Sequence, residues 1–103
     1  MKKTHSLRYL KRALLDMQEI INYIINEFSA PQSAANLLEK LENKIANLQY
    51  FPLAGKEFVT TDVFQDEYRV LIVENYLVFY VVYEDSVEIR RVINAKREYE
   101  KLL

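Results

Sequence analysis

One stretch of the chain, residues 67–99, decides the fold: EYRVLIVENYLVFYVVYEDSVEIRRVINAKREY. It contains three runs rich in Val, Ile, Tyr and Phe, the residues that half-buried strands favour. Polar turns separate the runs, and Asn75 tolerates the positive φ that a two-residue hairpin turn requires. The sequence therefore predicts an antiparallel meander of three strands, at residues 67–73, 76–83 and 87–93.

The turns also predict the register of the meander. The first turn sets Arg69 opposite Tyr80, and a second two-residue turn, at Glu84-Asp85, sets Arg91 opposite Val78. One face of the sheet then carries Arg69, Leu71, Val73, Tyr76, Val78, Tyr80, Ile89 and Arg91. The other face carries Tyr68, Val70, Ile72, Leu77, Phe79, Val81 and Val92. We expect the second face to take the helices and the first to be partly solvated, with two guanidinium groups on it.

Before the meander, apolar residues recur at three- and four-residue steps, as in amphipathic helices. The first helix is expected from Leu10 to about Ser29, because Pro31 bars continuation but suits the first turn of a new helix. Its apolar stripe comprises Leu14, Met17, Ile20, Ile21, Ile24, Ile25 and Phe28. The second helix, residues 31–49, buries Ala34, Leu37, Leu38, Leu41, Ile45 and Leu48. The short link makes the pair an antiparallel hairpin.

Two short segments complete the expected fold. Residues 4–9 are expected to form an edge strand, and residues 57–60 a further short strand. A chain of 103 residues supports one modest core, so residues 1–103 are interpreted as a single domain. The predicted class is α+β: an N-terminal strand, an antiparallel two-helix hairpin, an antiparallel sheet of three to four strands with the helices on one face, and a short basic C-terminal segment.

The composition argues against several kinds of site. The chain has no Cys and one His, His5. Disulfides, thiolate nucleophiles, multi-His metal sites and His-centred triads are therefore not expected, and neither is any metal or other cofactor. No apolar run approaches the roughly 20 residues of a membrane span, and no signal-peptide pattern opens the chain. The expected location is the cytoplasm.

The net charge of −1 hides an asymmetry. Residues 1–12 carry five basic groups and no acid, and residues 86–103 carry five basic and three acidic groups. Residues 13–85 carry four basic and twelve acidic groups. If the two basic ends meet in space, they would form a patch that attracts phosphate. The alternative is that these charges are ordinary solvated side chains.

The order of elements and several short motifs resemble the RelE/ParE superfamily of toxins from bacterial type II toxin–antitoxin systems. The motifs span nearly the whole chain in family order: DMQEII (16–21), YI (23–24), PQSAA (31–35), LQYFP (48–52), YRVL (68–71), NYLVFY (75–80), RVI (91–93) and KREY (96–99). The resemblance implies a small toxin neutralised by an antitoxin encoded beside it. Members that resemble RelE cut messenger RNA in the ribosome, and members that resemble ParE inhibit DNA gyrase. The fold does not decide between them.

Cutting RNA without a metal requires a base, an acid and cations that stabilise the phosphorane. The resemblance implies a catalytic set of Arg69, Arg91, Arg97 and Tyr99, with Lys56, Lys96 and Tyr80 as RNA contacts. Arginine stays ionised and suits bidentate phosphate contacts, and Tyr99 would stack on a base or carry a proton. Ribosome-dependent mRNA cleavage, by an endoribonuclease, is the first functional hypothesis.

The same residues have structural alternatives. Arg69 would cap the sheet edge or pair with a neighbouring acid, Arg91 would pair with an acid of the helix hairpin, and Tyr80 would pack on the sheet. Between residues 52 and 73 this chain has only Lys56 and Arg69, whereas the family's nucleases carry several cations there. This departure favours a gyrase inhibitor or a non-catalytic, protein-binding toxin, with the helix hairpin and the sheet edge as docking surfaces.

Overall fold

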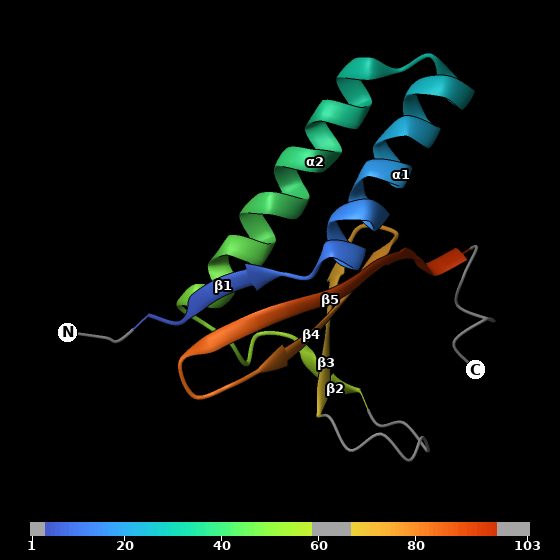
Figure 1. The fold of residues 1–103 in the computed structure, drawn as a ribbon. Coiled ribbons are helices and arrows are strands. Elements are labelled where there is room, and N and C mark those ends of the chain that lie inside the picture. Colours follow the sequence, from blue (N-terminus) through green and yellow to red (C-terminus); the bar gives the residue numbers. More distant parts are fainter. Residues whose placement is uncertain (1–3, 59–66, 97–103) are drawn as a thin grey trace.

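The computed structural model describes residues 4–58 and 67–96 as a five-stranded sheet with two helices on one face (Figure 1). The elements are β1 (Ser6–Tyr9), α1 (Lys11–Phe28), α2 (Pro31–Ala46), the 3-10 helix η1 (Asn47–Gln49), β2 (Lys56–Phe58), β3 (Tyr68–Val73), β4 (Tyr76–Val82) and β5 (Ser86–Asn94). The strand order is β1-β5-β4-β3-β2. The predicted α+β class, with an N-terminal edge strand and a helix hairpin, is confirmed.

The edge strand β1 runs parallel to β5, with Ser6 opposite Ser86 and Tyr9 opposite Ile89. Parallel neighbours need a long connection, and here the helix hairpin lies between β1 and the antiparallel strands. The other pairs are antiparallel, as predicted. The short strand expected at residues 57–60 is β2, and residues 59–60 lie outside the described residues.

The first hairpin has the predicted register, with Arg69 opposite Tyr80 and Val73 opposite Tyr76. The backbone of its turn differs from the prediction in one respect. The positive φ, 55°, belongs to Glu74 and not to Asn75. The Glu74 carboxylate is held there by the Lys40 ammonium of α2, which donates to it at 2.6 Å.

The second hairpin departs from its predicted register halfway along. Ile89 lies opposite Tyr80, but the register then shifts by one residue, and Arg91 lies opposite Phe79 instead of Val78. The extra residue is Arg90, so this is a β-bulge, which adds one residue to one strand of a pair. Val92 consequently lies opposite Val78.

The helices cover the face that the sequence analysis assigned to solvent. The core joins α1 and α2 to Val73, Tyr76, Val78, Tyr80 and Ile89, and the bulge adds Val92 to the same cluster. The predicted assignment was wrong because both faces are apolar. Alternation groups residues by face, but it does not tell which group meets the helices.

The helix α1 buries a narrower stripe than predicted, namely Ala13, Asp16, Met17 and Ile20. Leu14 and Phe28 are 53% and 65% exposed. Figure 1 shows why the end of this helix buries little, since the far end of the hairpin extends beyond the sheet. The helix α2 buries Ala34, Leu37, Leu41 and Ile45 of the predicted stripe, whereas Leu38 is partly buried and the helix ends at Ala46, with buried Leu48 in η1. Within the described residues, neither helix has the length and hydropathy of a membrane span.

Candidate functional site

Arg69 and Tyr80, opposite each other on β3 and β4, both bind the loop that follows η1. Tyr80 is fully buried, and its hydroxyl donates to the Pro52 carbonyl oxygen at 2.8 Å. The same hydroxyl accepts the N–H of Gly55 at 2.8 Å. Arg69 Nη1 donates to the Gly55 carbonyl oxygen at 2.6 Å, and the Arg69 side chain is only 19% exposed. Both residues therefore serve as anchors of residues 50–55.

The packing around Gly55 leaves no room for a side chain. A Cβ atom at this position would lie 2.6 Å from the Tyr80 hydroxyl oxygen and 2.7 Å from the Val70 carbonyl oxygen. Burial raises the pKa of Tyr80, and the Gly55 N–H and the Arg69 charge oppose that rise. The Tyr80 hydroxyl is thus a protonated structural group at neutral pH, and the Tyr80 side chain is fully buried.

Arg91 forms an ion pair with Asp16 of α1. Arg91 Nε lies 2.8 Å from Asp16 Oδ2, and Nη2 lies 3.2 Å from Oδ1. Asp16 is 4% exposed, and Arg12 Nε approaches its Oδ1 at 3.2 Å. The structural alternative for Arg91, an ion pair with an acid of the hairpin, is confirmed.

Asp16 also completes the edge of the sheet. The last backbone hydrogen bond from the β1 side runs from the Leu10 N–H to the Ile89 carbonyl oxygen, at 3.0 Å. Further along β5, the Val92 N–H donates to Asp16 Oδ2 at 3.0 Å. Beyond the end of β1, the Asp16 side chain of α1 thus accepts a backbone hydrogen bond from β5. Sequence reasoning gave Asp16 no role, although it lies between Ala13 and Ile20 on the buried stripe, where an acid needs a partner.

A second buried carboxylate, Glu88, lies in the row of Tyr68 and Val81, on the sheet face away from the helices. Arg8 and Arg90 both donate to Glu88, which is 5% exposed. Burial by itself would raise the pKa of Glu88, but the hydrogen bonds and charges of Arg8 and Arg90 outweigh it and hold the pKa below its usual value. Sequence reasoning did not single out this network.

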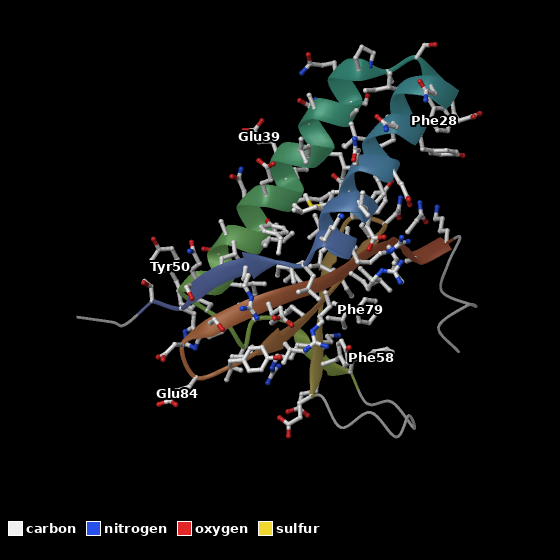
Figure 2. The ribbon with its side chains drawn as sticks, viewed as in Figure 1. Phe28, Glu39, Tyr50, Phe58, Phe79 and Glu84 are labelled. Atoms are coloured by element: carbon white, nitrogen blue, oxygen red, sulfur yellow. The ribbon has the colours of Figure 1, made fainter. Side chains whose placement is uncertain are left out.

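Arg90 connects that carboxylate to two tyrosines. Its guanidinium donates to the Tyr68 hydroxyl at 3.1 Å and to the Tyr83 hydroxyl at 2.8 Å, and it lies 5.5 Å from the centre of the Tyr68 ring. Phe58 and Phe79 pack edge to face on the same side of the sheet, with ring centres 5.1 Å apart (Figure 2).

The two basic ends of the chain do meet, because β1 pairs with β5. Their charges, however, are used within the protein. Arg12 and Arg91 surround Asp16, and Arg8 and Arg90 surround Glu88. In residues 4–58 and 67–96, the arginines of the two ends thus neutralise two buried acids.

The other candidates are dispersed. Lys56 is exposed on β2, at the edge opposite β1. Lys96 is exposed just after β5, and its N–H donates to Asn94 Oδ1 at 2.9 Å. Arg97 and Tyr99 lie outside the described residues. The described part of the chain brings no group of acids and histidines together that could hold a metal ion.

The sequence matches a known protein family, and the fold matches solved structures. A family model described as "ParE toxin of type II toxin-antitoxin system, parDE" matches residues 7–99. Among solved structures, the chain is similar to the chromosomal ParDE system of P. aeruginosa, at 17% identity and a TM-score of 0.73, over 90% of this chain and 98% of that chain. No match was found among curated proteins.

Two further structures share the fold. The RelB-RelE antitoxin–toxin complex from Methanococcus jannaschii is 16% identical, with a TM-score of 0.60, over 93% of this chain and 99% of that chain. The E. coli DinJ-YafQ toxin–antitoxin complex is 11% identical, with a TM-score of 0.56, over 90% and 94%. The family match covers nearly the whole chain and agrees with the fold: the protein belongs to the ParE toxin family of type II toxin–antitoxin systems, within the RelE/ParE superfamily.

Proposed function

We propose that this toxin acts by binding a protein target, as ParE-like toxins do when they inhibit DNA gyrase, and not by cutting RNA. The observation that carries the proposal is the use of Arg91 in the fold. Its guanidinium neutralises Asp16, a carboxylate that is only 4% exposed. Moving Arg91 to a phosphate would leave that buried charge without its main partner, which is strongly unfavourable.

The other described candidates support the same proposal. Arg69 and Tyr80 are the anchors of residues 50–55, and Tyr80 has no exposed surface. Lys56 and Lys96 are exposed, but they lie on β2 and after β5, on elements separated by β3 and β4. A phosphorane needs several cations around one point. The family match, to a model of ParE toxins, supports a ParE-like target as well.

Two assays run in parallel test this proposal. Purified toxin is added to a gyrase supercoiling reaction and to a reconstituted translation reaction, in which primer extension reads the message. We expect supercoiling to fail and the message to stay intact. Ribosome-dependent cuts that disappear in Arg97→Ala, but persist in the control Lys44→Ala, would overturn the proposal and establish the nuclease hypothesis. Intact supercoiling would exclude gyrase as the target.

The partner that neutralises the toxin is proposed to be a cognate antitoxin, and the outer edge of β3 suits it. The strand β2 pairs only with residues 68–70 of β3. Because Val73 and Tyr76 flank a two-residue turn, they exchange hydrogen bonds, and the alternate residue, Ile72, directs its N–H and carbonyl oxygen to the outer side. Proteins usually protect such edges, yet Ile72 is 58% exposed.

A groove of about 640 Å³ runs beside this edge. Its lining residues are Lys40, Asn43, Lys44, Asn47, Ile72, Val73 and Glu74. An extended antitoxin segment that adds a strand to β3 would gain backbone hydrogen bonds there. An apolar side chain of that segment would cover Ile72, and acidic side chains would meet the lysines of α2.

The variant Ile72→Pro tests this docking surface. Proline removes the outward N–H but is tolerated on an edge strand whose N–H faces solvent. We expect Ile72→Pro to weaken antitoxin binding about tenfold or more, the effect of losing more than 1.4 kcal/mol. The control Ile72→Val keeps the N–H and should bind normally, and both variants should retain toxicity. Full antitoxin affinity in folded Ile72→Pro would show that the antitoxin docks elsewhere.

A further inference from the structure

Residues 50–53 present three large apolar side chains to solvent at the end of α2. Tyr50 is 59% exposed, Phe51 54% and Leu53 64%. Figure 2 shows Tyr50 pointing away from the body of the protein. Large exposed apolar groups that gather within a few residues mark interaction surfaces more often than single ones do.

This segment is held by an extensive set of hydrogen bonds. The N–H groups of Tyr50 and Phe51 both donate to the Asn47 carbonyl oxygen, at 3.1 and 3.0 Å, and the Ala54 N–H donates to the Phe51 carbonyl oxygen at 3.1 Å. From the sheet, the buried Tyr80 hydroxyl forms hydrogen bonds with both the Pro52 carbonyl oxygen and the Gly55 N–H. Arg69 donates to the Gly55 carbonyl oxygen. Because the backbone is already ordered, binding through this segment loses little conformational entropy.

The segment also lacks charge. Residues 45–55 contain no acidic or basic side chain, and the charge that binds the segment, the Arg69 guanidinium at Gly55, belongs to a side chain that is only 19% exposed. Nucleic-acid binding depends on cations that neutralise phosphates. A rigid, uncharged surface bearing Tyr, Phe and Leu instead fits an apolar pocket on a protein, where buried aromatic anchors contribute most of the affinity.

Another exposed aromatic side chain lies at the tip of the helix hairpin. Phe28 is 65% exposed and packs edge to face on Tyr23 of its own helix, with ring centres 5.8 Å apart. Phe28 precedes α2 and Tyr50 follows it, so the two lie at opposite ends of that helix (Figure 2). Phe28 therefore serves as an apolar control that is remote from residues 50–55.

We propose that residues 50–55 form the target-recognition loop of this toxin, with Phe51 and Leu53 entering an apolar pocket on the protein that the toxin inhibits. The inference rests on the proposed function in one respect, that the target is a protein. The loop is distinct from the β3 edge, where the antitoxin is expected to dock. Tyr80 and Arg69 act as positioning residues that hold the loop in its binding shape.

The experiment compares Phe51→Ser, Leu53→Ser and the remote control Phe28→Ser. Each is measured for growth arrest on induction, for inhibition of supercoiling, for antitoxin affinity and for thermal unfolding. We expect the two loop variants to need about ten times more toxin for half-inhibition, as truncating an interface anchor does, while antitoxin affinity stays within about twofold. Phe28→Ser should match wild type in growth arrest, in inhibition of supercoiling and in antitoxin affinity.

The variant Tyr80→Phe keeps every apolar side chain of the loop but removes the hydroxyl anchor. We expect it to weaken inhibition less than Leu53→Ser does, with antitoxin affinity unchanged. If folded Phe51→Ser and Leu53→Ser arrest growth like wild type, the inference is overturned. It is equally overturned if these variants lose antitoxin affinity but not toxicity.

The growth readout separates this inference from the proposed function. If wild-type toxin arrests growth without affecting supercoiling, gyrase is not the target, and loss of growth arrest in the loop variants still supports the recognition loop. If ribosome-dependent cleavage appears and persists in the loop variants, both proposals fall.

Discussion

The part of the chain that the structure describes buries two carboxylates, each between two arginines, and they perform different tasks. Asp16 lies between layers: it binds Arg91 through both oxygens and also accepts a backbone N–H of β5. Glu88 lies within the sheet, on the face away from the helices, and is held by the side chains of Arg8 and Arg90. Arg8 is 66% exposed, whereas Arg90 is 20% exposed and also contacts two tyrosines.

Neighbouring arginines of one strand, β5, bind the two carboxylates. Arg90 and Arg91 are adjacent, yet Arg90 binds Glu88 on the open face of the sheet while Arg91 reaches Asp16 of α1. Asp16 joins helix to sheet, so its loss should affect the whole core. Glu88 organises a network on the open face in which Arg90 also binds two tyrosine hydroxyls, so the loss of Glu88 should remain local.

The largest effect is expected from Asp16→Ala. It removes the partner of Arg91 and leaves the Val92 N–H without an acceptor. We expect a loss on the order of 3 kcal/mol in the free energy of unfolding, the lower end for a broken buried ion pair, because Arg91 can still reach solvent. Urea denaturation of Asp16→Ala measures this, with the exposed Glu19→Ala of the same helix as control. A loss below about 1 kcal/mol would contradict the role of Asp16 as a joint between layers.

A smaller effect is expected from Glu88→Gln. Arg90 still donates to the hydroxyls of Tyr68 and Tyr83, so we expect a loss of about 1.5 kcal/mol in the free energy of unfolding, the lower end for a hydrogen bond to a charged group. The same denaturation experiment applies, with the exposed turn residue Glu84→Gln as control. If Glu88→Gln lowered the free energy of unfolding as much as Asp16→Ala does, the two carboxylates would not differ in their structural roles.

The pH dependence of stability should report on Glu88. Its folded pKa lies below the usual 4.5, so its contribution is complete above that pH and is lost as the pH falls through the folded pKa. Unfolding curves measured from pH 6 to pH 2 should therefore decline less steeply in Glu88→Gln than in wild type. Identical slopes would mean that Arg8 and Arg90 do not favour the ionised form.

The smallest effects are expected from the exposed arginines. Arg8 and Arg12 are 66% and 52% exposed, and each shares its carboxylate with a less exposed partner. Arg8→Ala and Arg12→Ala should each cost about 0–1 kcal/mol, as exposed ion pairs do. Thermal unfolding of the two variants beside Arg91→Ala sharpens the comparison, because only Arg91→Ala should approach the cost of Asp16→Ala.

The sequence predicted the elements and the first hairpin because alternation and turn residues act locally. The two-residue turn alone determines that Arg69 lies opposite Tyr80. The bulge at Arg90 has no such signal, since Arg-Arg in a strand does not show which residue is extra. The wrong choice of helix-facing side followed from two apolar faces that differ little in composition.

The roles of the candidate residues depended on contacts distant in sequence. Arg91 and Asp16 are 75 residues apart, and Tyr80 and Pro52 are 28 apart. One signal for the loop was nevertheless present: Gly55 is the single glycine of the chain. A single glycine in a chain indicates a position where other atoms approach the backbone closely. At Gly55 these atoms are the Tyr80 hydroxyl oxygen and the Val70 carbonyl oxygen.

The parallel pairing of β1 with β5 has a consequence for synthesis. Arg8 and Glu88 are 80 residues apart, and a ribosome adding about 5–20 residues per second needs roughly 4–16 s to make that span. Throughout that interval the nascent chain lacks both the neighbour of β1 and two of the groups that bind Asp16, the Arg91 guanidinium and the Val92 N–H. The protein thus completes its fold only after most of the polypeptide has been synthesised.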